Sequence, residues 1–147
     1  MQFWIESEDQ RDALIDKLLS LKLPFQFNAT LGSKRSLAQN RLLQKWYKEI
    51  GQQMYEDAEY ARAYCKLHFG IPILRADNDQ FKEKYDEFLK DKTYEHKMAA
   101  MVWPFELPVT SIMNIKQLTE YLEAMHRFFT EKGFHLTDPE IDKDSQP

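Results

Sequence analysis

The clearest helical pattern in the chain is SLAQNRLLQKWYKEIGQQMY, residues 36–55. Apolar side chains recur along it at the spacing of one helix face, at Leu43, Trp46, Tyr47, Ile50 and Met54. Basic side chains occupy the opposite face. The stretch therefore predicts a long amphipathic helix in which Trp46 and Tyr47 are buried.

The residues before this helix predict a small strand-helix-strand unit. Residues 2–5 form a short apolar run typical of a strand, and Ser7 begins a helix that we expect to end near Leu21. Pro24 follows, and residues 25–31 alternate apolar with polar side chains, which is the pattern of a half-buried strand.

The residues after it predict two further helices. Asp57 is expected to cap a helix that Gly70 and Pro72 close. Residues 77–97 carry mixed charge and few apolar side chains, so we expect a helix on the outside of the fold.

The C-terminal third predicts a connection, a strand and a last helix. Residues 98–107 are apolar but contain a proline, which favours a buried connection or an edge strand, and residues 109–113 fit a strand. Asn114 is expected to cap a helix that Gly133 stops. The whole pattern predicts an α+β fold, with the strand-helix-strand unit followed by several helices.

Length and composition predict one domain. The chain has 147 residues, of which 43% are hydrophobic, and this fits a single core over residues 1–136. Residues 137–147 carry four acids and one base and are expected to form an acidic flexible tail. The aromatic residues, 14% of the chain, exceed the needs of one small core. We therefore expect subunit burial for four that flank apolar stripes: Tyr60, Tyr64, Tyr121 and Phe128.

Charge is divided unevenly along the chain. The formal net charge is −4, but residues 1–75 hold 11 bases and 9 acids, net +2, and residues 76–147 hold 9 bases and 15 acids, net −6. One basic cluster stands out, at Lys34, Arg35, Arg41, Lys45 and Lys48. Such a cluster predicts salt-sensitive phosphate contacts to nucleic acid. The alternative is that it forms the solvated face of an amphipathic helix.

Ser36 and Gln39 have the spacing of a capping box, in which Ser36 caps the helix and Gln39 bonds back to the cap. In helical projection Gln39 falls near the apolar side. It could serve as a polar contact to nucleic acid if this turn lined a cleft.

Other site chemistry has little support in the sequence. The four histidines are scattered, and the single cysteine, Cys65, is expected to be a buried apolar residue in a reducing compartment. No spacing predicts a metal, a cofactor or a nucleophilic triad. No leader or membrane-length apolar run is seen, so we expect a cytoplasmic protein.

Two blocks of sequence resemble the NinB or Orf family of phage recombination mediators. The first is Arg-Ser-Leu-x-Gln-Asn-Arg, matched at residues 35–41. The second comprises Thr110-Ser111-x-Met113, Glu120-x-Leu122-Glu123 and residues 130–133, running into Thr137-Asp138. Residues 71–105 do not share the resemblance, and Ile112 and Asn114 stand where the family places arginines.

The resemblance implies a non-enzymatic, intertwined homodimer in the cytoplasm of a bacterial host. It would bind single-stranded DNA and the host single-strand-binding protein so that a recombinase can load. Gln39 matches a family residue implicated in DNA binding, with Arg35 and Arg41 on either side. Two alternatives stay open: a small metal-dependent phage nuclease or junction resolvase, and a protein adaptor that does not bind DNA.

Overall fold

The computed structural model describes residues 5, 7–29 and 34–139, with the side chains of residues 34–37 outside the description. The chain divides into two compact units, residues 1–37 and 38–147, where the sequence predicts one domain over residues 1–136. In the first unit, α1 (Glu8–Ser20) begins at a capping box formed by Ser7 and Gln10, which confirms the predicted helix start. None of the residues of α1 is buried.

The predicted α+β fold is wrong, because the described residues contain helices and no strand. Residues 25–29 are irregular, since an alternating pattern forms a strand only where another strand pairs with its backbone. The strand expected at residues 109–113 is instead the 3-10 turn η2 (Thr110–Ile112), where the amide of Met113 donates to the carbonyl of Thr110. Of the strand expected at residues 2–5, only Ile5 is described, and it belongs to no element.

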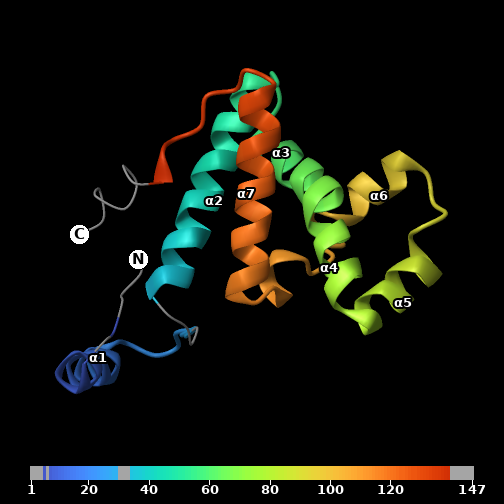
Figure 1. The fold of residues 1–147 in the computed structure, drawn as a ribbon. Coiled ribbons are helices and arrows are strands. Elements are labelled where there is room, and N and C mark those ends of the chain that lie inside the picture. The colour runs from blue at the N-terminus through green and yellow to red at the C-terminus, as the bar shows by residue number, and fades with distance from the viewer. Residues whose placement is uncertain (1–4, 6, 30–33, 140–147) are drawn as a thin grey trace. The chain divides into compact units, whose positions relative to one another are not determined.

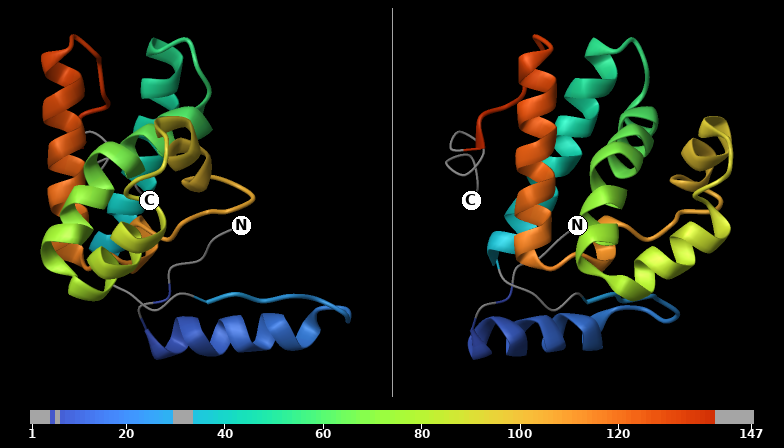
Figure 2. Two further views of the ribbon diagram at one scale, coloured as in Figure 1. Left: turned by 90° about the vertical axis from the view of Figure 1, so that its right-hand side faces the viewer. Right: turned by 45° about the vertical axis from the view of Figure 1, so that its right-hand side comes forward.

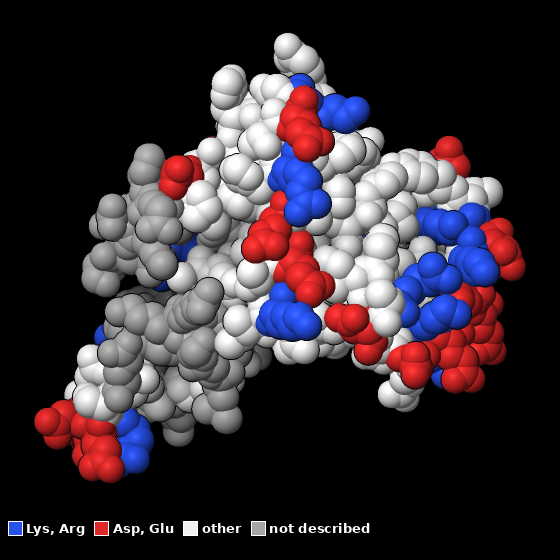
Figure 3. All heavy atoms as spheres, viewed as in Figure 1, with Lys and Arg blue, Asp and Glu red and all other residues white. Residues whose placement is uncertain are grey.

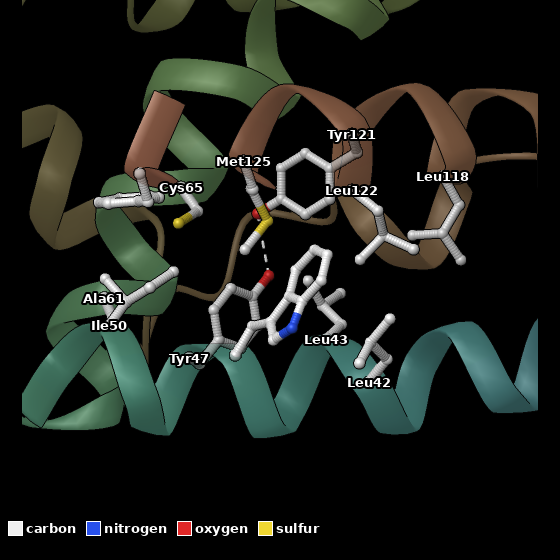
Figure 4. Packing of buried hydrophobic residues seen from close by; sticks show 12 residues of the cluster. Leu42, Leu43, Tyr47, Ile50, Ala61, Cys65, Leu118, Tyr121, Leu122 and Met125 are labelled. Carbon is white, nitrogen blue, oxygen red and sulfur yellow. Dashed lines mark hydrogen bonds between the residues drawn. The ribbon is translucent and has the colours of Figure 1, made fainter. Parts of the chain in front are cut away.

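The second unit is built on two long helices, α2 (Lys34–Gln53) and α7 (Ile115–Glu131). They run side by side in the same direction (Figure 1). Their facing residues, with those of α3 (Ala58–Cys65), form the α2–α7 core, which includes Leu43, Trp46, Tyr47, Ile50, Tyr121, Leu122, Met125 and Phe129 (Figure 4). The amphipathic prediction for residues 36–55 is therefore confirmed, with Trp46 only 1% exposed.

A second core lies around the shorter helices. α3 continues through the π-helical turn η1 (Lys66–Gly70) into α4 (Ile71–Asp77), as Figure 2 shows. It is followed by α5 (Asp79–Phe88) and α6 (Tyr94–Ala100). The second core is made by residues of these helices and of the segment after them: Ala63, Ile71, Leu74, Tyr85, Met101 and Val109.

The predicted stop at Gly70 is wrong, because the helical path continues past it. A Cβ at this position would lie 2.4 Å from Cγ1 of Val109, so Gly70 permits close packing instead of ending a helix. Pro72 lies in the first turn of α4, where a missing amide is tolerated. The helix expected over residues 77–97 is two helices, capped separately by Asn78 and Thr93.

Other local predictions are confirmed. Asp57 caps α3 by accepting from the amide of Tyr60, and Asn114 caps α7 by accepting from the amide of Gln117. Gly133 follows α7 with a φ of 89°, a backbone conformation that favours glycine.

Of the four aromatic residues predicted to be buried between subunits, Tyr121 is buried within the chain itself, and the burial of the other three between subunits stays a prediction. Tyr121 is fully buried, and Tyr64 and Phe128 pack against Phe129 in one aromatic cluster. Tyr60 alone of the four predicted positions is exposed.

Candidate nucleic-acid interface

The basic face of α2 consists of Arg41, Lys45 and Lys48, and all three side chains are exposed. They recur at intervals of four and three residues, so they share one side of the helix, opposite the buried stripe. The apolar residues of α2 that enter the core thereby fix the direction in which the three cations point. Packing of the core therefore places these charges in solvent.

The three cations differ in their described contacts. Within the described part of the chain, neither Arg41 nor Lys48 has an acidic side chain at ion-pair distance. Lys45 already takes part in an interaction within the chain. An added anion would therefore gain the most binding free energy from Arg41 and Lys48.

Glu49 is the one acid in α2, and its carboxylate is engaged elsewhere. Its oxygens accept from the amide of Thr137 at 3.0 and 3.1 Å and from the hydroxyl of Thr137 at 2.7 Å. The indole of Trp46 donates to the carbonyl of the same threonine at 2.8 Å. The segment predicted to begin a flexible tail at residue 137 is thus attached to α2 at its first residue.

Gln39 lies between α2 and α7. Its Nε2 donates to Oγ1 of Thr119 at 2.8 Å, and that hydroxyl donates to the carbonyl of Ile115 at 2.9 Å. Among the described residues, the Oε1 of Gln39 is buried without a hydrogen-bond donor. The side chain therefore ties the two long helices together.

The side chain of Ser36 lies outside the description, so the predicted capping box of Ser36 and Gln39 stays a prediction. α2 is described from Lys34, which makes Ser36 its third described residue. The side-chain amide of Gln39 donates to Thr119. Lys34 and Arg35 lie in the first turn of α2, and their side chains are outside the description, so the predicted contacts of these two residues remain predictions.

The exposed side of α7 differs from the basic face of α2. Figure 3 shows acidic and basic side chains alternating along α7, where Lys116, Glu123 and Arg127 are exposed. A mixed-sign face has little net attraction for a polyanion. Of the two departures from the family pattern, Ile112 is exposed in η2, while Asn114 serves as the cap of α7.

The structure also places the residues that were weighed for other chemistry. Cys65 is buried, and burial raises the pKa of its thiol. Among the described residues, no group of three or more histidine, cysteine, aspartate or glutamate side chains could hold a metal ion. Within the same residues, we find no helix with the length and apolar character needed to span a membrane.

Sequence reasoning missed two features of the second unit. One is a pocket between α3 and α6, and the other is a partly buried cluster of Arg62, Lys66 and Glu106. The cluster joins α3 and η1 to a residue about 40 positions further along, which no local pattern reveals. For the pocket, the acids at the starts of both helices were the available signal.

Comparison of the chain with protein-family models, with curated proteins and with solved structures finds no match.

Proposed function

We propose that the basic face of α2 binds the phosphate backbone of single-stranded DNA. The observation that carries the proposal is the exposure of Arg41 and Lys48 on one helix face, neither with a carboxylate partner in the described part of the chain. Cations in this state bind phosphates without first breaking an ion pair, and binding releases counterions from the DNA. Such contacts give affinity that is independent of sequence and falls as salt is raised.

A single strand is favoured over a duplex by an exposed ring beside the same helix. Tyr55 lies two residues after the end of α2 and is 96% exposed. An exposed aromatic ring can stack on an unpaired base, whereas paired bases stack on each other. Trp46 and Tyr47 are buried and take no part in such stacking.

The specific role that we propose is that of a phage or prophage recombination mediator in the bacterial cytoplasm. In this role the protein binds single-stranded DNA together with the host single-strand-binding protein and helps to load a recombinase. The sequence Arg-Ser-Leu-x-Gln-Asn-Arg at residues 35–41 supports this role, and it includes Arg41 of the basic face. The proposal assigns no catalytic step to the protein.

We further propose a homodimer, supported by apolar side chains in the first unit. Leu19 and Leu23 are 80% and 77% exposed, and Ile15 and Phe27 are also exposed. A second copy would bury such side chains. Sedimentation of the full chain at micromolar concentration should give the mass of two copies, and the mass of one copy would contradict the dimer.

The DNA-binding proposal is tested by fluorescence anisotropy of a labelled oligothymidine over a range of sodium chloride concentrations. For single strands, each phosphate contact contributes about 0.7 to the slope of log affinity against log salt. Replacing both cations, with Arg41→Ala and Lys48→Ala, should therefore reduce that slope by about 1.4 and weaken binding at every salt concentration.

The matched control is Lys92→Ala, which removes an exposed lysine outside α2. It should leave both the affinity and the slope unchanged. An equal loss of affinity in the control and in the double variant would show that the effect comes from net charge alone. No loss of affinity in either would place the DNA site elsewhere.

The two alternative functions predict different outcomes in the same sample. A nuclease would cut the oligonucleotide with magnesium and not with chelator. An adaptor would retain the single-strand-binding protein in a pull-down and show no affinity for the oligonucleotide.

A further inference from the structure

A pocket of about 530 Å³ lies between α3 and α6, in elements separate from the basic face of α2. Its walls are apolar, with Ala63 from α3, Met98 and Ala99 from α6, and Val102 from the segment that follows. Two tyrosines, Tyr60 and Tyr94, complete the lining. A pocket of this size and lining can hold the hydrocarbon part of a side chain.

The pocket residue Tyr94 contacts His68. Its hydroxyl lies 2.9 Å from Nε2 of His68, and the ring of His68 packs on that of Tyr64 with centroids 4.1 Å apart. These contacts restrain the Tyr94 ring, which lines the pocket, and an aromatic ring attracts a cation to its face.

The polar lining of the pocket is acidic. Asp57, Glu59 and Glu95 contribute to it, and among its described lining residues there is no lysine, arginine or histidine. One acid of the lining is paired with a cation, since Nε of Arg62 lies 3.4 Å from Oε1 of Glu59. Arg62 also binds Glu106 through both terminal nitrogens, so its charge is shared between two acids.

We propose that this pocket binds a lysine or arginine side chain carried by a segment of a partner protein. The aliphatic stem would lie along the apolar walls, while the charged end would lie among the three carboxylates and the tyrosine rings. The charge complementarity selects a basic side chain, because an acidic one would face three like charges, of which only that of Glu59 is paired with Arg62.

The surroundings of the pocket favour a protein segment over a free polyamine. Trp103 and Phe105 follow the pocket residue Val102 closely in the chain and are 80% and 74% exposed. Exposed aromatic side chains next to a pocket are typical of protein-binding surfaces. A free polyamine could satisfy the carboxylates, but it would leave these two rings in water.

A purely structural role of the acids makes a different prediction. Asp57 caps α3, and Glu59 and Glu95 lie in the first turns of α3 and α6, where acids stabilise a helix. If that were their whole role, the protein would select no basic ligand, and neutralising Glu95 would change only the stability of α6. Experiments that measure binding and folding separately distinguish the two roles.

The test is selection of random twelve-residue peptides on the full chain. We expect peptides that combine lysine or arginine with apolar residues, and we expect Glu95→Gln to weaken the best of them about tenfold. Glu123→Gln, which neutralises an exposed acid on α7, is the matched control and should leave their affinity unchanged. Ala99→Trp should fill the pocket and abolish binding, with helix content checked by circular dichroism.

Several outcomes would overturn the proposal. These are selection of no peptide, selection of peptides without basic residues, or equal affinity of the best peptide for the protein and for Glu95→Gln. Displacement of the peptide by spermidine at equal concentration would identify a polyamine site instead. Because Glu95→Gln should leave oligothymidine binding intact, failure here and failure of the DNA proposal are separate results.

Discussion

The two cores of the second unit are closed in different ways. The α2–α7 core joins two long helices through apolar and aromatic side chains, with one hydroxyl pair, Tyr47 and Tyr121, inside it (Figure 4). The second core is closed by the segment 101–107, which a cluster of charges holds to α3 and η1. The stability of the first core depends on packed apolar volume. The stability of the second core depends also on paired polar groups at its edge.

The largest expected effect is the loss of Trp46 from the α2–α7 core. Trp46→Ala should lower the free energy of unfolding by about 3–5 kcal/mol, because the cavity removes both burial and contacts. Urea unfolding followed by circular dichroism measures this loss. Trp103→Ala removes the same side chain from an 80% exposed position and should change stability by less than about 0.5 kcal/mol. Similar costs for the two variants would contradict this description of the core.

The parts of the fold that are predictable from sequence are those that local signals determine. Helical periodicity identified α2 and α7, and side-chain caps identified Asp57 and Asn114, because these signals are local. The strand expected over residues 25–31 does not form in its described part, residues 25–29, since alternation cannot show whether a pairing strand exists. Gly70 was misread because its need for a small side chain comes from Val109, 39 residues away.

In the candidate site too, local features were predictable and contacts between distant residues were not. The exposure of Arg41, Lys45 and Lys48 follows from the helical period alone, so their common face was predictable. The bond from Gln39 to Thr119 joins residues 80 positions apart. Helical projection placed Gln39 near the apolar side but could not supply its partner.

The second expected effect concerns the hydroxyl pair inside the α2–α7 core. The oxygens of Tyr47 and Tyr121 lie 2.9 Å apart, and both are buried. Tyr47→Phe or Tyr121→Phe alone leaves one buried hydroxyl unpaired and should cost about 1–3 kcal/mol. The double variant should cost less than the sum of the two, since it leaves neither hydroxyl behind. Additive costs in urea unfolding would show that the pair is not coupled.

The same pair predicts a dependence on alkaline pH. Burial raises the pKa of both hydroxyls above the ordinary value of 10.0. Above pH 10 the unfolded chain therefore releases these protons while the folded chain keeps them, so the free energy of unfolding falls as pH rises. The double phenylalanine variant should show a smaller fall, measured by urea unfolding between pH 8 and pH 11. An identical fall would assign the effect to other groups.

The smallest expected effect is at the edge of the second core. Glu106 accepts from Arg62, with Nη1 at 3.1 Å, and its carboxylate lies 3.5 Å from Nζ of Lys66, which is 4% exposed. Glu106→Gln keeps the shape but removes the counter-charge, and it should cost about 1 kcal/mol, because Glu106 itself is partly in solvent. Lys66 still donates to the carbonyl of Met101, which limits the loss.

Glu106→Gln should also change how stability depends on pH. Burial, with Arg62 nearby, lowers the pKa of Lys66, whereas Glu106 raises it. Below the ordinary lysine pKa of 10.5, the folded chain thus binds fewer protons than the unfolded chain, and the free energy of unfolding rises with pH. Removing Glu106 lowers the Lys66 pKa further and should extend that rise to lower pH. Glu87→Gln, on exposed α5, should produce neither the cost nor the altered slope. Equal behaviour of the two variants would mean that the second core is closed by packing alone, as the first one is.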